Sequence, residues 1–327
     1  MDTSAEASGE HSQWQVRSYS GGDIVLNKDK NIVLSLERFP GVAKYAGEQL
    51  VVTDGTTLLG ADDKAGIAII VETARYFVEH PEIPHAKLCF AVTPDEEVGR
   101  GTENFDIEEF GAQYAYTFDG DELGGFETET FNAAMVKVHF EGLNVHPGSA
   151  KNKMVNAIRM AMDFIARLPA ESAPEKTEGH EGFFHPMGIS GAVRGVDLKM
   201  LIRDHSNSRF EDRMNYVRKM VEEMNKVWGD RVSAEIKVKY HNLKNYLDKH
   251  PAVCKLAREA YRRIGVEIHE KPVRGGTDGA RLSAKGLPTP NLFTGGMNYH
   301  GVYECLSVTG IQRALDLGIM LGKMSAE

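Results

Sequence analysis

Short apolar runs, each followed by a stretch of helical periodicity, are the feature that most narrows the folds open to this chain. Such alternation is typical of βαβ units, because a strand buried on both faces is a continuous apolar run and its covering helix repeats every three to four residues. The runs expected to form strands are 88–92, 114–118 and 290–293. The stretches expected to form helices are 65–78, 252–264 and 308–324. Together they predict an α/β domain with a central, mostly parallel sheet and flanking helices.

The middle of the chain has a different pattern. Strands are expected at 135–140, 187–193, 198–202 and 234–240, and helices at 154–168 and 210–228. The order βαββαβ suits a two-layer sandwich that is inserted into the α/β domain. We therefore expect one domain formed by residues 1–131 and 245–327, and an inserted lid domain formed by residues 132–244.

The charge of the chain bears on its partners. Its 327 residues include 38 Lys and Arg against 47 Asp and Glu, a formal net charge of −9. Nucleic-acid binding is not expected, because phosphate neutralisation needs a basic stripe that the sequence lacks. No apolar run reaches the ~18 residues of a membrane span, and the polar first residues lack the order of a signal peptide. We expect a cytoplasmic protein with no membrane partner.

Four acidic or imidazole clusters each follow a strand-like run. They contain Asp62 and Asp63, Asp95 to Glu97, Asp119 and Asp121, and Asn298 to His300. A single acidic pair of this kind is most often a solvated turn or a helix cap. Four pairs at the carboxyl ends of strands would converge at one edge of a sheet, where carboxylates repel one another unless cations lie between them. Oxygen and imidazole donors suit zinc or manganese, so the pattern predicts a dinuclear metal site.

Nucleophilic catalysis by serine or cysteine has little support in the sequence. There is no GxSxG elbow, and the three cysteines show no CxxC spacing. Cys305 lies five residues after His300, yet nothing beside it suggests an activated thiolate, and a small buried role is expected.

Five segments together resemble one known family. They are Gly60-Ala61-Asp62-Asp63-Lys64-Ala65-Gly66, Thr93-Pro94-Asp95-Glu96-Glu97-Val98-Gly99, Val145-His146-Pro147-Gly148, Arg274-Gly275-Gly276-Thr277-Asp278-Gly279 and Asn298-Tyr299-His300-Gly301. In this order and spacing they resemble the peptidase T family, the cytoplasmic tripeptide aminopeptidases of the co-catalytic M20 metallopeptidases. The likeness runs from Met1 to about residue 320. It implies a catalytic domain of the zinc-peptidase type and the inserted lid.

The resemblance also implies roles for individual residues. Asp62 would bridge two divalent metal ions, expected to be zinc, and would be followed by a cis peptide bond to Asp63. Glu97 and His300 would complete one metal's ligands, and Asp119 would help to hold the other. Glu96 would be the general base that activates water.

Substrate binding is implied for three further residues. His146 would contribute to oxyanion or carboxylate binding, and Arg203 and Arg274 would pair with the terminal carboxylate of a tripeptide. The alternatives are a His-Pro turn for His146 and a surface ion pair for each arginine. Pairing of two copies through their lids is left open as a possible homodimer.

The start of the chain departs from the family pattern. The family's first metal ligand is the histidine of a His-x-Asp-Thr motif, whereas this chain begins Met1-Asp2-Thr3-Ser4. Asp2 matches the aspartate that orients this ligand, and outer groups of this kind affect activity by about 10 to 100-fold. The expectation is an N-terminally truncated form with one metal position weakened. An active aminotripeptidase, an impaired relic that binds peptide or a single metal, and a related M20 deacylase remain alternatives.

Overall fold

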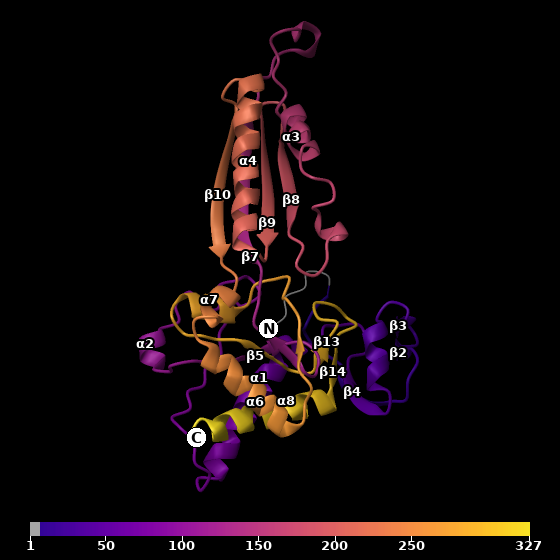
Figure 1. Ribbon diagram of the computed structural model, residues 1–327. Coiled ribbons are helices and arrows are strands. Elements are labelled where there is room, and N and C mark those ends of the chain that lie inside the picture. Colours follow the sequence, from indigo (N-terminus) through magenta and orange to yellow (C-terminus); the bar gives the residue numbers. More distant parts are fainter. Residues whose placement is uncertain (1–6) are drawn as a thin grey trace. The chain divides into compact units, whose positions relative to one another are not determined.

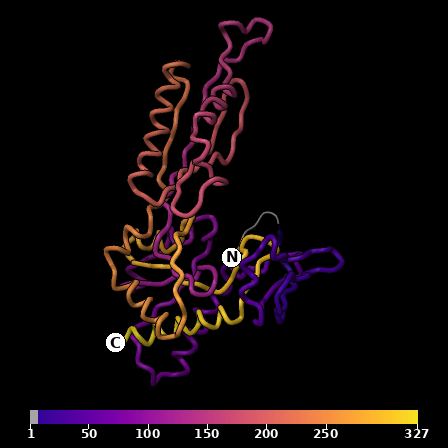
Figure 2. The backbone as a smooth tube through the Cα atoms, turned by 45° about the vertical axis from the view of Figure 1, so that its right-hand side comes forward, coloured from indigo at the N-terminus to yellow at the C-terminus, as the bar shows by residue number. Residues whose placement is uncertain are grey.

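The computed structural model describes residues 7–327, which divide into two compact units (Figure 1). Unit 1 consists of the chain up to Thr128, Tyr246–Lys271 and Thr277–Glu327, and unit 2 consists of Glu129–Asn245 and Pro272–Gly276. Figure 2 follows the chain by colour, and both its indigo start and its yellow end belong to unit 1. The expected α/β fold class is confirmed.

Unit 1 combines short strands with longer helices. Its strands are β1 (Gln15–Tyr19), β2 (Ile24–Asn27), β3 (Ile32–Leu34), β4 (Glu48–Val52), β5 (Thr117–Gly120), β6 (Gly125–Glu127), β11 (His269–Glu270), β12 (Asn291–Phe293), β13 (Gly296–Met297) and β14 (Cys305–Ser307). Its helices are α1 (Ala61–Glu79), α2 (Ile107–Phe110), α6 (Pro251–Ile264), α7 (Asp278–Ala284) and α8 (Val308–Met324), with a 3₁₀ turn at Pro40–Tyr45. The short helix α5 (Lys244–Leu247) spans the boundary between the units. Among the described residues, no helix is both long and apolar enough to cross a membrane.

The pairing of strands in unit 1 is mixed rather than mostly parallel. In the sheet β11-β6-β12-β5, the pairs β11–β6 and β12–β5 are parallel and the pair β12–β6 is antiparallel. The sheet β1-β4-β14-β13 is antiparallel throughout. Helix α1 packs against α8 and β5. A Cβ at Gly66 would overlap the carbonyl oxygen of Phe118, so the first turns of α1 lie next to β5.

One strand prediction is wrong. Residues 88–92 form no strand, although their apolar run predicts one. Phe90 and Val92 are 43% and 60% exposed. A strand needs a neighbour to complete its hydrogen bonds, and no strand of the described chain pairs with this segment. The apolar run alone therefore does not produce a strand.

Unit 2 has the expected βαββαβ order. Its elements are β7 (Asn132–Glu141), α3 (Ala157–Ala166), β8 (Phe183–Ala192), β9 (Gly195–Asp204), α4 (Asn207–Trp228) and β10 (Val232–Tyr240), with 3₁₀ turns at Pro147–Ser149 and Pro174–Lys176. The strands form an antiparallel sheet in the order β10-β7-β9-β8. Side-chain caps explain where both helices begin, since Asn156 and Ser206 accept hydrogen bonds from the first-turn N–H groups.

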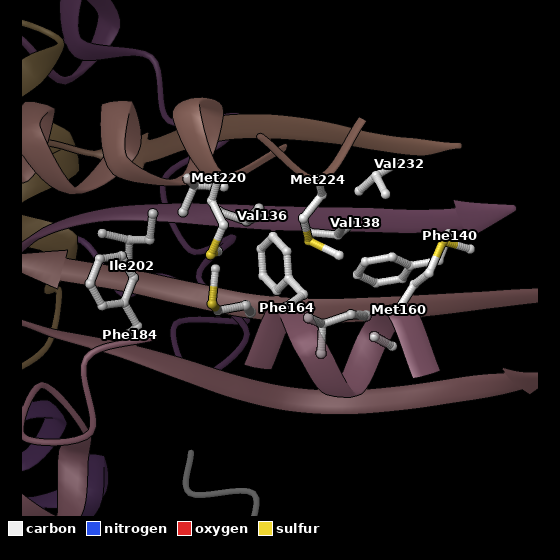
Figure 3. Packing of buried hydrophobic residues seen from close by; sticks show 14 of the residues in the cluster. Val136, Val138, Phe140, Met160, Phe164, Phe184, Ile202, Met220, Met224 and Val232 are labelled. Atoms are coloured by element: carbon white, nitrogen blue, oxygen red, sulfur yellow. The ribbon is translucent and has the colours of Figure 1, made fainter. Parts of the chain in front are cut away.

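The core of unit 2 lies between the sheet and its two helices (Figure 3). The strands alternate in burial, so every second side chain of β7 and β9 points toward α3 and α4. Phe164 of α3 is fully buried and meets Phe140 of β7 edge to face, with ring centroids 5.6 Å apart. Met220 and Met224 of α4 fill the same layer. The unit thus has a continuous hydrophobic core of its own.

We predict that Phe164→Ala lowers the free energy of unfolding by about 3–5 kcal/mol, because it leaves a cavity among fully buried side chains. Arg159→Ala, at an exposed position of the same helix, should change it by less than about 0.5 kcal/mol. Urea unfolding followed by circular dichroism measures both. Equal effects of the two substitutions would contradict this description of the core.

Candidate active site

Three of the predicted metal-binding side chains lie together in unit 1. One ligand atom from each of Asp62, Glu97 and His300 lies within 4.8 Å of the other two. Nε2 of His300 is 3.1 Å from Oδ2 of Asp62 and 3.5 Å from Oε2 of Glu97. Asp62 and Glu97 are partly buried, whereas His300 is exposed. Two carboxylates and an imidazole from distant parts of the sequence therefore converge, and such a donor set suits a divalent cation.

Asp62 is placed by the irregular start of α1. Gly60, immediately before the helix, has a left-handed backbone (φ 67°), which glycine adopts without steric cost. Asp62 and Asp63 have non-helical backbone angles, and the peptide bond between them is cis, as the resemblance implies. The carboxylate of Asp63 turns back and accepts a hydrogen bond from the N–H of Gly66, at 3.0 Å. The two adjacent acids therefore have different surroundings.

Glu96 and Glu97 lie in a turn. Asp95 has a positive φ of 59°, which is uncommon outside glycine, and its carbonyl accepts a hydrogen bond from the N–H of Arg100 at 3.0 Å. The carbonyl of Glu96 accepts from the N–H of Gly99 at 2.6 Å. The backbone of this turn, rather than the alternation of side chains along a strand, thus sets the directions of Glu96 and Glu97. In the part of the chain that the structure describes, the carboxylate of Glu96 has no hydrogen-bond partner.

His300 lies in the loop between β13 and β14. Both Asn298 and His300 have positive φ angles, 58° and 63°. A positive φ costs free energy for residues other than glycine, and such positions often occur at functional sites. The side chain of Asn298 steadies the loop by donating to the carbonyl of Tyr303 at 3.3 Å. The loop therefore holds His300 in an unfavourable backbone conformation beside Asp62.

Asp119 lies on β5 and does not belong to the group of three. Its N–H donates to Oδ1 of Asn291 on β12, at 3.1 Å. Asn291 in turn donates through Nδ2 to Oε2 of the partly buried Glu127, at 2.6 Å. Burial raises the pKa of Asp119 well above its usual value, and the charges of Asp63, Glu96 and Asp62 raise it further. Asp119 is therefore close enough to the other acids for their negative charges to raise its pKa.

Burial of neighbouring carboxylates raises their pKa values, and repulsion between them adds to the rise. Burial raises the pKa of Asp63 to about 8, with a further contribution from the charge of Asp62. Burial also raises the pKa of Glu96 to about 7, and Asp278 and Glu97 add to the rise. Each of these acids resists ionisation because its neighbours are also acids in a poorly solvated place. Cations between them would remove this cost, so the residues fit a metal centre.

Asp278, Thr93, Arg281 and Gly101 surround this site, and no role was predicted for any of them. Oδ2 of Asp278, at the start of α7, accepts a hydrogen bond from Oγ1 of Thr93 at 2.9 Å. Arg281 pairs with the other oxygen of Asp278 at 3.4 Å. A Cβ at Gly101 would overlap the carboxylate of Asp278. Asp278 stands in a motif quoted for the resemblance, but only the folded chain shows that it contacts the segment of Glu96 and Glu97.

Two of the predicted substrate-binding residues lie together in unit 2. Nη1 of Arg203 donates to the carbonyl of Arg274 at 2.9 Å. Arg274 itself donates to the carbonyls of Gly179 and Glu181, each at 2.9 Å, and its guanidinium lies over the rings of two phenylalanines. Neither arginine pairs with a carboxylate among the described residues, so the alternative of a surface ion pair is not observed.

The remaining predicted residues are placed as follows. His146 is exposed in unit 2 and caps the 3₁₀ turn that follows it, where its Nδ1 accepts from the N–H of Gly148 at 3.1 Å. This hydrogen bond is the contact expected for the alternative interpretation of His146, a His-Pro turn. Asp2 lies outside the described residues. Cys305 is fully buried, and burial raises the pKa of its thiol to about 12, which agrees with a small apolar role.

Comparison with known proteins places this chain among peptidases. A family profile described as the peptidase dimerisation domain matches residues 128–229. Peptidase T from Clostridium acetobutylicum is 49% identical over 329 residues, which cover 100% of this chain and 81% of the relative. A crystal structure of the aminopeptidase PepT from Bacillus cereus matches with a TM-score of 0.73 and 28% identity, over 85% of this chain and 74% of that chain.

A tripeptidase structure from Staphylococcus aureus shares the fold, with a TM-score of 0.74, 24% identity and the same two coverages, 85% and 74%. The family profile, the relatives and the similar structures define the class of this chain as an M20-type peptidase. Within that class, the chain belongs to the peptidase T family.

Proposed function

We propose that this chain removes the N-terminal residue from tripeptides by metal-dependent hydrolysis, with Glu96 as the general base. The observation that carries the proposal is the convergence of Asp62, Glu97 and His300 to within 4.8 Å. The name of the relative from Clostridium acetobutylicum and the description of the Staphylococcus aureus structure as a tripeptidase support the choice of substrate.

The residues present fit two divalent cations, for which we propose zinc. Asp62, Glu97 and His300 would hold one, and Asp62 together with Asp119 would hold the other. When bound, such a pair supplies positive charge that lowers the pKa of water and polarises the carbonyl group of a peptide. Burial, with the charges of neighbouring acids, raises the pKa values of Asp63 and Asp119, and this supports a position for positive charge beside them.

Glu96 is suited to moving the proton. Its carboxylate is partly buried and has no hydrogen-bond partner among the residues that the structure describes, so its oxygens are available to a water molecule. Glu96 would accept the proton of the attacking water and deliver it to the amine that leaves. Glu97, the next residue, lies 3.5 Å from His300 and would therefore bind the metal rather than move the proton.

We propose that unit 2 is the lid domain and that its residues would select substrates by their length. Arg203 and Arg274 carry positive charges whose hydrogen-bond partners here are neutral carbonyl and hydroxyl oxygens. Guanidinium groups in this state can bind a peptide's terminal carboxylate, because planar donors match its two oxygens. His146, with Nδ1 occupied by the N–H of Gly148, would offer Nε2 to the oxyanion or carboxylate.

We predict that Glu96→Gln lowers kcat/KM for a tripeptide by about 100 to 10,000-fold, the usual contribution of a general base. Elemental analysis should still find about two zinc ions per chain, because the general base is not a metal ligand. Glu103→Gln is the matched control, since Glu103 follows in the same segment and its side chain forms an exposed ion pair with Arg100. A chain that holds one metal or none and turns over no tripeptide would favour the impaired relic.

We predict that the parent chain prefers a free tripeptide to the same tripeptide with a C-terminal amide, and that Arg203→Met removes this preference. The KM of the free acid should rise about 10-fold or more, since a charge-assisted hydrogen bond contributes about 1.5–3 kcal/mol, while the KM of the amide stays the same. Steady-state kinetics on both peptides measure the effect. Faster hydrolysis of an N-acylated tripeptide than of the free one would support the M20 deacylase instead.

We also propose that the chain pairs with a second copy of itself through β8. The dimerisation profile matches most of unit 2, and β8 is an edge strand that exposes 53% of both Met187 and Ile189. On the neighbouring helix α3, Ile158 and Met162 are 41% and 64% exposed. An unpaired edge beside apolar side chains is a surface that another strand can extend.

Light scattering after size exclusion should therefore give about twice the chain mass of 36.1 kDa. Ile189→Lys should shift the protein to the monomer, because it places a charge on the paired edge. Val238→Lys is the control, at a position 38% exposed on the opposite edge strand β10. A parent chain that is monomeric at every concentration tested would contradict the pairing.

A further inference from the structure

A buried glutamate that no prediction included contacts the segment of Asp62. Glu304 is 1% exposed and lies in the loop between β13 and β14, four residues after His300. Its Oε2 accepts a hydrogen bond from the N–H of Gly60 at 2.6 Å, and its Oε1 accepts from the N–H of Asp62 at 3.0 Å. Each carboxylate oxygen thus holds one backbone group at the start of α1.

These two hydrogen bonds satisfy groups that would otherwise lack partners. The first N–H groups of a helix have no acceptor within the helix, and a buried carboxylate is costly unless donors surround it. Hydrogen bonds to a charged acceptor are stronger than neutral ones. On the carbonyl side of the same segment, Nζ of Lys64 donates to the oxygen of Leu59 at 2.6 Å. The backbone from Leu59 to Asp62 is therefore held at both its carbonyl and its N–H groups.

The loop of Glu304 also carries His300. The N–H of Glu304 donates to the carbonyl of Gly301 at 3.2 Å, which closes a tight turn between the two side chains. His300 approaches the carboxylate of Asp62 at 3.1 Å, while Glu304 holds the N–H of the same residue. The segment from His300 to Glu304 thus contacts Asp62 at two points. His300 lies beside the side chain of Asp62, and Glu304 accepts from its backbone N–H.

We propose that Glu304 is a positioning residue for the metal centre: its carboxylate fixes the backbone of Asp62 so that the Asp62 side chain meets Glu97 and His300. This inference rests on the proposed function for the metal itself, but the backbone clamp can be tested without it. Glu304 touches neither substrate nor metal in this role, and its effect passes through Asp62.

The test compares the full-length parent chain with Glu304→Gln and Glu304→Asp. Glutamine keeps the length of the side chain but replaces one acceptor oxygen with a donor that faces a backbone N–H. Aspartate keeps both acceptors on a side chain that is one methylene shorter. The control is Glu48→Gln on β4, since Glu48 accepts from Ser307 Oγ at 2.9 Å in the sheet next to Glu304 but does not contact residues 60–62.

Hydrogen exchange of the metal-free proteins measures the clamp directly. In Glu304→Gln, the amides of residues 60 and 62 should exchange about 10-fold faster or more, which corresponds to the loss of about one hydrogen bond. Glu48→Gln should leave them unchanged. Unchanged exchange in Glu304→Gln would overturn the clamp.

Titration with Co²⁺ measures the positioning of the ligands without any turnover. Glu304→Gln should bind Co²⁺ about 10 to 100-fold more weakly, with a shifted visible absorption band, and Glu304→Asp should be intermediate. Faster amide exchange with the affinity and spectrum of the parent would make Glu304 purely structural and would overturn the proposal. A parent chain that binds no Co²⁺ would overturn the metal centre itself, and amide exchange would then report the clamp separately.

Discussion

Partial burial of several neighbouring carboxylates is the constraint on which the site of unit 1 depends. Asp62, Asp63, Glu96 and Asp119 come from three separate segments, and the charges of the first three all raise the pKa of Asp119. Such a collection is unfavourable unless positive charge compensates for it, because desolvation and like charges both oppose ionisation. Because the folded loops hold these acids close together, cations bound between them would be favourable.

Rigid backbone anchors hold the acids where they repel one another. Asp62 is held through its N–H by Glu304, and Asp119 is held through its N–H by Asn291, which is itself oriented by Glu127. In both cases a buried side chain from a distant segment binds the backbone N–H group of the acid. Restraint through the backbone fixes the direction of the side chain, which favours binding of a cation.

Periodicity predicted the elements that bury one continuous face. The helix expected at 308–324 is observed as Val308–Met324, and the order of elements in unit 2 follows from alternation and helical spacing alone. The run 88–92 was misjudged because a strand depends on a partner that local sequence does not reveal. The residue types of the site could be predicted, since four acidic or imidazole clusters, and not one, follow apolar runs. Glu304 could not be predicted, because its partner Gly60 lies 244 positions away and contributes only a backbone group.

The two arginines of unit 2 illustrate how backbone contacts couple side chains. Arg203 donates to the backbone carbonyl of Arg274, and the side chain of Arg274 donates to the carbonyls of Gly179 and Glu181. The short segment Pro272–Gly276, which belongs to unit 2 although unit 1 residues flank it in sequence, is thereby fixed by both guanidinium groups. Displacement of either arginine must shift the other. Substitutions at the two positions should therefore not be additive, since residues that share contacts rarely act independently.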